Sequence, residues 1–82
     1  MKYFSRGEEG ETVEVLELEV QKVEIRYGLP DDECELQRFV KLKGYPDWLR
    51  LSIPETYKNA NEARKRAFDW FQKYRREVTV NE

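Results

Sequence analysis

The sequence predicts an α+β domain in which a three- to four-stranded antiparallel sheet packs on one C-terminal amphipathic helix. Three observations predict this fold. Apolar and polar residues alternate between Thr12 and Tyr27, which is the period of a half-buried strand. Short turn segments separate the apolar runs that follow, and a helical stripe of apolar residues begins after Asn59. At 82 residues, the chain has room for one core.

The first strand is expected to be long and bent. Residues 1–11 carry Gly7 and Gly10 among acidic residues, which predicts a flexible N-terminal lead-in and a single domain over residues 12–82. The apolar phase of residues 12–27 slips twice, and this segment contains no Gly, Pro, Asn or Asp. We therefore expect bulges rather than a tight turn, with two consecutive strands as the alternative.

Two hairpins follow the first strand. Residues 28–32 and 44–47 are rich in Gly, Pro and Asp, which is typical of turns. They delimit a second strand over residues 35–43 and a third over residues 48–53, which Pro54 ends. Alternation predicts a set of core-facing aliphatic residues on these strands: Val40, Leu42, Leu49, Leu51 and Ile53.

The C-terminal helix carries the clearest local signals. Asn59 is a favourable N-cap residue, and Glu62 three positions later completes a capping-box pattern. The small residues of the stripe come first, so we expect the helix to approach the sheet closely at its start and to rest on aromatic rings at its end. The stripe consists of Ala60, Ala63, Ala67, Trp70, Phe71, Tyr74 and Val78.

Charge is distributed unevenly along the chain. Residues 1–35 hold 11 acidic and 4 basic residues, whereas residues 36–82 hold 6 acidic and 11 basic residues. In one small domain, this asymmetry favours two halves that lie against each other. The absence of a long apolar run and of a secretory-signal pattern predicts a soluble cytoplasmic protein without membrane contact. The single Cys34 fits a reducing compartment.

The reactive side chains favour a protein that is not an enzyme. The chain has no His, so neither a Ser-His nor a Cys-His pair can form, and a carboxylate pair would need a cleft that small domains rarely offer. Acidic neighbours should raise the pKa of Cys34. No metal or cofactor is expected, because one acidic cluster lacks the spacing of a calcium loop: Asp31, Asp32, Glu33 and Glu35.

The most specific surface feature is a mixed basic and aromatic face. Alternation places five residues together on the outer side of the second and third strands: Phe39, Lys41, Lys43, Trp48 and Arg50. Such a face could stack nucleic-acid bases and contact phosphates. The favoured interpretation is instead that Phe39 and Trp48 form a cross-strand pair. The neighbouring lysines and arginine would then form ion pairs with acidic residues of the first strand: Glu14, Glu17, Glu19 and Glu24.

Residues 57–63, Tyr-Lys-Asn-Ala-Asn-Glu-Ala, resemble the helix entry of phage-integrase arm-binding domains and plant AP2 domains. Those families set a three-stranded sheet against DNA and support it with one helix. The resemblance, which is one of topology, implies Trp48 and Arg50 as candidate DNA contacts. The acidic first strand departs from the strongly basic sheets of these families.

These observations predict a small non-enzymatic interaction or regulatory protein of the inhibitor or adaptor type. We expect it to bind a protein partner through its exposed sheet face or a strand edge, and the edge would also permit a homodimer. The alternative is a nucleic-acid-binding module that uses the basic and aromatic face. The net charge of −2 favours the first hypothesis, because nucleic-acid affinity depends on neutralising phosphates.

Overall fold

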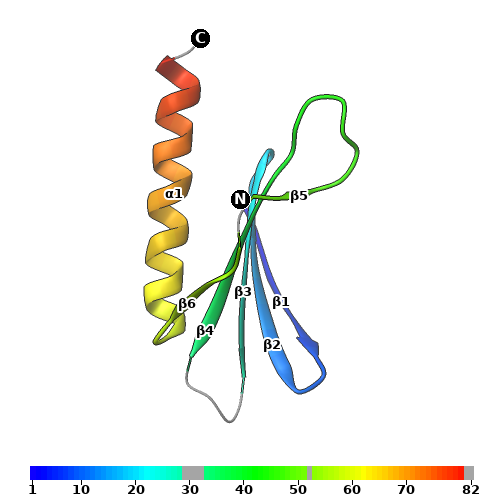
Figure 1. The fold of residues 1–82 in the computed structure, drawn as a ribbon, viewed down its shortest axis with the longest axis vertical. Helices are drawn as coiled ribbons and strands as arrows, with labels where there is room; N and C mark the ends of the chain where they lie inside the picture. Colours follow the sequence, from blue (N-terminus) through cyan, green and yellow to red (C-terminus); the bar gives the residue numbers. More distant parts are fainter. Residues whose placement is uncertain (29–32, 52, 81–82) are drawn as a thin grey trace.

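The computed structural model describes residues 1–28, 33–51 and 53–80, with side chains up to residue 73. Within these residues the elements follow one another along the chain (Figure 1) as β1 Lys2–Glu8, β2 Glu11–Glu17, β3 Gln21–Gly28, β4 Cys34–Val40, β5 Leu49–Arg50, β6 Glu55–Tyr57 and α1 Ala60–Val80. The strands form one antiparallel sheet and the helix follows them, so the predicted α+β class is confirmed. The sheet has more strands than the three to four predicted.

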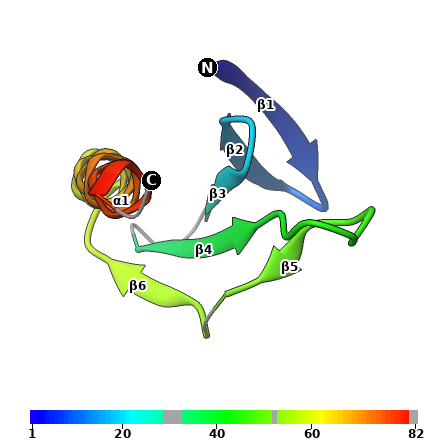
Figure 2. The ribbon, with the colours of Figure 1, turned by 90° about the horizontal axis from the view of Figure 1, so that it is seen from above.

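The sheet is an antiparallel meander in which two short strands, β5 and β6, occupy the position of the last strand. β1, β2, β3 and β4 are neighbours in chain order, and β5 and β6 both pair with the remaining edge of β4. The sheet curls, so that β1 lies on the side away from the helix (Figure 2). The free edges are therefore β1 on one side and the β5–β6 segment on the other.

The sheet begins at Lys2, so residues 1–11, predicted as a flexible lead-in, contribute its first strand and first turn. Glu8 lies opposite Glu11, and only Glu9 and Gly10 stand between them. Both have positive φ, 49° and 83°, as a two-residue type I′ hairpin requires. Gly10 adopts this conformation without a steric penalty.

Residues 12–27 form two consecutive strands, which was the alternative to the long bent strand that we favoured. The chain reverses at residues 18–21, where the Leu18 N–H donates to the Gln21 carbonyl at 2.7 Å. Neither Glu19 nor Val20 has positive φ. The turn therefore needs no Gly or Asn, two of the four residue types whose absence had argued against a tight turn.

The predicted third strand, residues 48–53, is interrupted. β5 covers only Leu49–Arg50, and the chain pairs with β4 again after Pro54, which has no N–H to donate to the ladder. The register between the two pairings contains extra residues on this strand, which makes a bulge. The predicted core positions Leu51 and Ile53 consequently lie outside the core, with exposed fractions of 50% and 83%. Leu42, predicted to face the core from the second strand, is 47% exposed because β4 ends at Val40.

The helix begins as predicted, because Asn59 Oδ1 accepts a hydrogen bond from the Glu62 N–H at 2.9 Å. It packs on β3, β4 and β6, and within the described residues its backbone does not approach β1 or β2 (Figure 2). Ala63 and Ala67 are fully buried, as the predicted close approach requires. Tyr74 and Val78 of the predicted stripe lie beyond the described side chains. The core consists of Leu16, Val23, Ile25, Cys34, Leu36, Ala63, Ala67 and Phe71.

Candidate interaction surfaces

The sheet has two faces, of which α1 covers one. We call the opposite one the outer face. Because side chains alternate along a strand, the register places a defined set from the four long strands on this face. The set comprises Lys2, Phe4, Arg6, Glu8, Glu11, Val13, Val15, Glu17, Lys22, Glu24, Arg26, Glu35, Gln37 and Phe39.

Four of the five predicted site residues meet at one end of the outer face. Phe39 lies opposite Arg50 in the pairing of β4 with β5. The Lys41 Nζ lies 4.9 Å from the centroid of the Trp48 ring. Lys43 differs, because β4 ends at Val40 and places it in the exposed loop that follows. Four of the five predicted residues therefore lie together, although Lys41 and Trp48 stand just outside β4 and β5, and Lys43 lies farther along the loop.

Lys22 belongs to this cluster, although the sequence argument did not include it. It lies opposite Phe39, and its Nζ is 4.5 Å from the Phe39 ring centroid and 5.1 Å from that of Trp48. The turn at residues 18–21 places Lys22 opposite Phe39, and the sequence carries no ordinary signal for that turn. Its cation already interacts with both rings from within the chain.

Ion pairs cover the centre of the outer face. Arg6 reaches across β2 to Glu24 at 3.4 Å, and Lys22 contacts the same carboxylate at 3.1 Å. Beneath this layer, Val13 and Val15 have exposed fractions of only 0% and 1%. We had expected Glu24 to pair with basic residues of the predicted site, but its partners are Arg6 and Lys22. Further pairs extend the layer: Arg6–Glu8, Arg26–Glu8 and Arg26–Glu11 at 3.4, 3.5 and 2.9 Å.

Glu14 was expected on the outer side, but it faces the helix side and is buried. It accepts hydrogen bonds from Arg64 of α1 at 2.7 and 2.9 Å and another from the Tyr3 hydroxyl. Burial raises the pKa of Glu14, but the hydrogen bonds from Arg64 and Tyr3 outweigh it, so the pKa is lowered. The Glu14–Arg64 pair joins the acidic first half of the chain to the basic second half, whereas the other ion pairs seen among the described residues each join two residues of the same half.

The two edges of the sheet differ in how they are protected. The β5–β6 edge is short and is broken by a bulge and Pro54, which are features that discourage strand addition. β1 is a continuous strand of seven residues, all of them exposed. In the described part of the chain, no strand lies beyond it (Figure 2).

Three residues of β1 present their backbone groups to this open side. Because Leu18 bonds to Gln21, the even-numbered residues of β2 bond to β3 and the odd-numbered ones bond to β1. The even-numbered residues of β1 lie opposite those odd-numbered residues and bond to them. The N–H and C=O groups that point away from the sheet are therefore those of Tyr3, Ser5 and Gly7.

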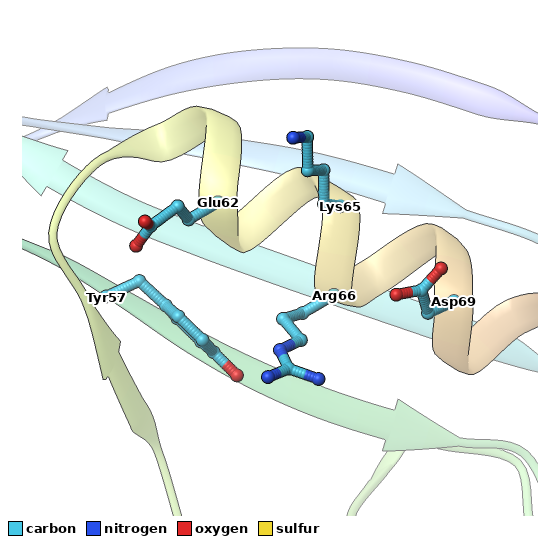
Figure 3. Close-up of a pocket in the computed structure, with 5 residues that line it drawn as sticks. All are labelled: Tyr57, Glu62, Lys65, Arg66 and Asp69. Carbon is cyan, nitrogen blue, oxygen red and sulfur yellow. The ribbon is translucent and has the colours of Figure 1, made fainter.

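A cavity of 390 Å³ lies between β6 and the exposed side of α1 (Figure 3). Its lining charges are all solvent-exposed, and its aromatic hydroxyl, from Tyr57, donates to Glu55 at 2.8 Å. An active site usually holds charged groups desolvated in a cleft, and this lining does not have that property. The cavity is lined by Tyr57, Glu62, Lys65, Arg66 and Asp69.

Cys34 is buried in the core, and the acidic cluster around it is only partly described. Burial is the main cause that raises the pKa of the Cys34 thiol, whereas we had expected its acidic neighbours to do so. Asp31 and Asp32 lie outside the described residues. Among the residues that are described, no group of three or more Cys, Asp or Glu side chains is placed to hold a metal ion. The described helix is not long and apolar enough to cross a membrane.

No known protein family matches this chain, and no curated protein or solved structure is significantly similar to it. The resemblance to phage-integrase arm-binding and plant AP2 domains therefore rests on the helix entry at residues 57–63, and the sheet has more strands than those families use. The functional interpretation depends on the geometry of the β1 edge and the outer face.

Proposed function

We propose that the chain is a non-enzymatic protein-binding module of the inhibitor or adaptor type, active in the cytoplasm, and that its partner adds a strand to β1. The observation that carries this proposal is the long, exposed and uninterrupted edge of β1. An added strand would bond to the outward N–H and C=O groups of Tyr3, Ser5 and Gly7. Natural proteins usually shield such an edge, so an unshielded one is a candidate binding site.

Side chains beside the edge can supply specificity. Tyr3 and Phe4 point to opposite faces and have exposed fractions of 56% and 40%. An incoming strand would contact one aromatic ring on each face, and aromatic residues are enriched in protein interfaces. The edge therefore combines main-chain hydrogen bonds with two apolar contacts. The centre of the outer face offers less, because ion pairs already cover its valines.

The test uses two substitutions of the same residue. The Ser5 N–H points away from β2, so Ser5→Pro removes a donor that an added strand needs and leaves the bonds to β2 intact. Ser5→Ala retains that N–H and is the matched control. Each variant, immobilised as bait, is exposed to a lysate of the native host, and bound proteins are identified by mass spectrometry. We expect a partner that the wild type and Ser5→Ala capture and Ser5→Pro does not. Equal capture by both variants would exclude the β1 edge.

A second candidate function is nucleic-acid binding by the cluster at the end of the outer face. The observation that favours it is the gathering of Lys22, Lys41 and Arg50 around Phe39 and Trp48. Base stacking on these rings would displace lysines that already interact with them, and the net charge of −2 opposes phosphate binding.

Oligonucleotide titration at two salt concentrations tests this second function. If it is correct, affinity falls as salt rises, and Trp48→Ala weakens binding more than the exposed helix variant Lys65→Ala does. Absence of binding at low salt, or equal effects of the two substitutions, would dismiss it.

A further inference from the structure

We infer that the strand added to β1 is β1 of a second copy of this chain, in an antiparallel pair centred on Ser5. This inference rests on the proposed strand-edge function and names its partner. The observation behind it is the order of side chains and backbone groups along β1. When a second β1 is placed antiparallel to the first, each group faces a complementary group of the other strand. A closed two-fold dimer requires such self-complementarity of its interface.

The backbone groups match when a two-fold axis passes through Ser5. Ser5 then faces Ser5 of the second copy, and Tyr3 faces its Gly7. These are the residues whose N–H and C=O groups point outward, so each such pair exchanges two hydrogen bonds. A slip of one residue in this register would place outward groups opposite groups that are already bonded to β2.

The side chains match in the same register. Lys2 lies opposite Glu8 of the second copy, which pairs opposite charges at both ends of the interface. Phe4 lies opposite Arg6 on the outer face, where its ring can contact the apolar stem of an arginine whose guanidinium pairs with Glu8 and Glu24 of its own chain. On the other face, Tyr3 lies opposite Gly7, and an aromatic ring across from an edge glycine stabilises strand pairing.

The neighbouring symmetric registers are worse. An axis through Phe4 places Lys2 opposite Arg6, and an axis through Arg6 places that residue opposite itself, so each brings like charges together. Both also leave part of the seven-residue strand unpaired. The register centred on Ser5 is the one that pairs the whole strand without a like-charge contact.

The edge is accessible for this pairing. β1 lies away from α1, and the views of Figures 1 and 2 show no other element beyond its outer side in the described part of the chain. One added strand makes an interface at the small end of the range for specific complexes, so a dissociation constant of roughly 1–100 µM is expected. The dimer should therefore form and dissociate over ordinary working concentrations.

The first measurement is the mass in solution by sedimentation equilibrium from about 1 µM to about 500 µM protein. We expect the mass to rise from 10.0 kDa to twice that value. Ser5→Pro should stay at the lower mass, and Ser5→Ala should behave as the wild type. A dimer that is equally strong in both Ser5 variants would overturn this interface.

A charge exchange tests the register. Lys2→Glu places a carboxylate opposite Glu8 of the second copy, and Glu8→Lys places an ammonium group opposite Lys2. Each change creates two like-charge pairs per dimer and should weaken dimerisation about tenfold. An equimolar mixture of the two variants restores opposite charges in both pairs and should recover the wild-type affinity. Lys43→Glu makes the same charge change as Lys2→Glu, but in an exposed loop, and should leave dimerisation unchanged.

The outcomes separate the homodimer from the broader function. If the mixture dimerises no better than its separate components, the Ser5-centred register is overturned. If the wild type remains at 10.0 kDa at every concentration, the homodimer is overturned, whereas the strand-edge function is still decided by lysate capture with the Ser5 variants.

Discussion

At the scale of single residues, Glu14 links parts of the molecule that backbone packing leaves apart. α1 packs on β3, β4 and β6, and the Arg64 side chain is what reaches from the helix to Glu14 on β2. Tyr3 of β1 donates to the same carboxylate. A buried carboxylate needs such partners, since an unpaired charge in this position would cost several kcal/mol. One acidic residue thereby ties β1, β2 and α1 together.

Replacing Arg64 should reveal the strength of this link. Arg64→Met keeps the apolar stem of the side chain and removes the two hydrogen bonds to Glu14. We expect the free energy of unfolding to fall by about 2–3 kcal/mol in urea denaturation, with the lower part of the range favoured because Arg64 is partly exposed. Lys65→Met, at the exposed neighbouring position, should change it by less than about 0.5 kcal/mol. Equal effects would show that the link contributes little.

The same carboxylate should make stability depend on acidity. Folding lowers the pKa of Glu14 from its ordinary value of 4.5. Its contribution to stability is therefore complete above pH 4.5 and is lost as the pH falls through the lower pKa of the folded state. We expect Glu14→Gln to be less stable than the wild type at neutral pH and to lose less stability between pH 7 and about pH 3. Urea unfolding at several pH values measures this, and parallel profiles for the two proteins would contradict it.

At the scale of elements, the sequence predicts those that carry their own local signals. The helix is such an element, because Asn59 caps it and Ala63 and Ala67 repeat at helical spacing. β1 is the opposite case. All of its residues are exposed, so the alternation that marks a half-buried strand is absent, and its place is set by pairing with distant residues of β2.

The candidate surfaces follow the same division. The aromatic and basic cluster could be predicted from alternation, since Phe39 and Arg50 lie on strands whose phase is visible in the sequence. Lys22 and the β1 edge could not, because each depends on a turn without an ordinary turn signal. The turn at residues 18–21 uses backbone angles that any residue adopts, and the type I′ turn places Glu9 where Asn, Asp or Gly is usual.

The first hairpin should therefore depend on Gly10. Its φ of 83° is unfavourable for a residue with a Cβ, so Gly10→Ala should lower the free energy of unfolding by about 1 kcal/mol. Gly7→Ala is the matched control, because Gly7 lacks positive φ and its added Cβ would meet its nearest neighbour at an ordinary distance of 3.9 Å. Urea unfolding at low protein concentration compares them. A larger loss in Gly7→Ala would contradict the assigned turn.

At the scale of the whole molecule, the helix packs on β3, β4 and β6, so β1 and β2 must be stabilised by other contacts. β2 remains buried because the ion pairs of Arg6 and Glu24 cover Val13 and Val15 on one face, while Leu16 enters the core on the other. β1 has no such cover and is held by its ladder with β2 and by the bond from Tyr3 to Glu14. The packing on the helix and the proposed binding edge thus lie on opposite sides of the sheet.

Amide exchange along β1 should show this division directly. In dilute solution, the amides of Phe4, Arg6 and Glu8 should exchange slowly because they bond to β2, whereas those of Ser5 and Gly7 should exchange rapidly into solvent. At concentrations where the dimer forms, the exchange rates of the Ser5 and Gly7 amides should fall roughly in proportion to the fraction of chains that remain monomeric. NMR exchange spectra at two concentrations measure the pattern. Protection that rises equally at all five residues would indicate general stabilisation and contradict strand pairing, because only an added strand distinguishes alternate residues of β1.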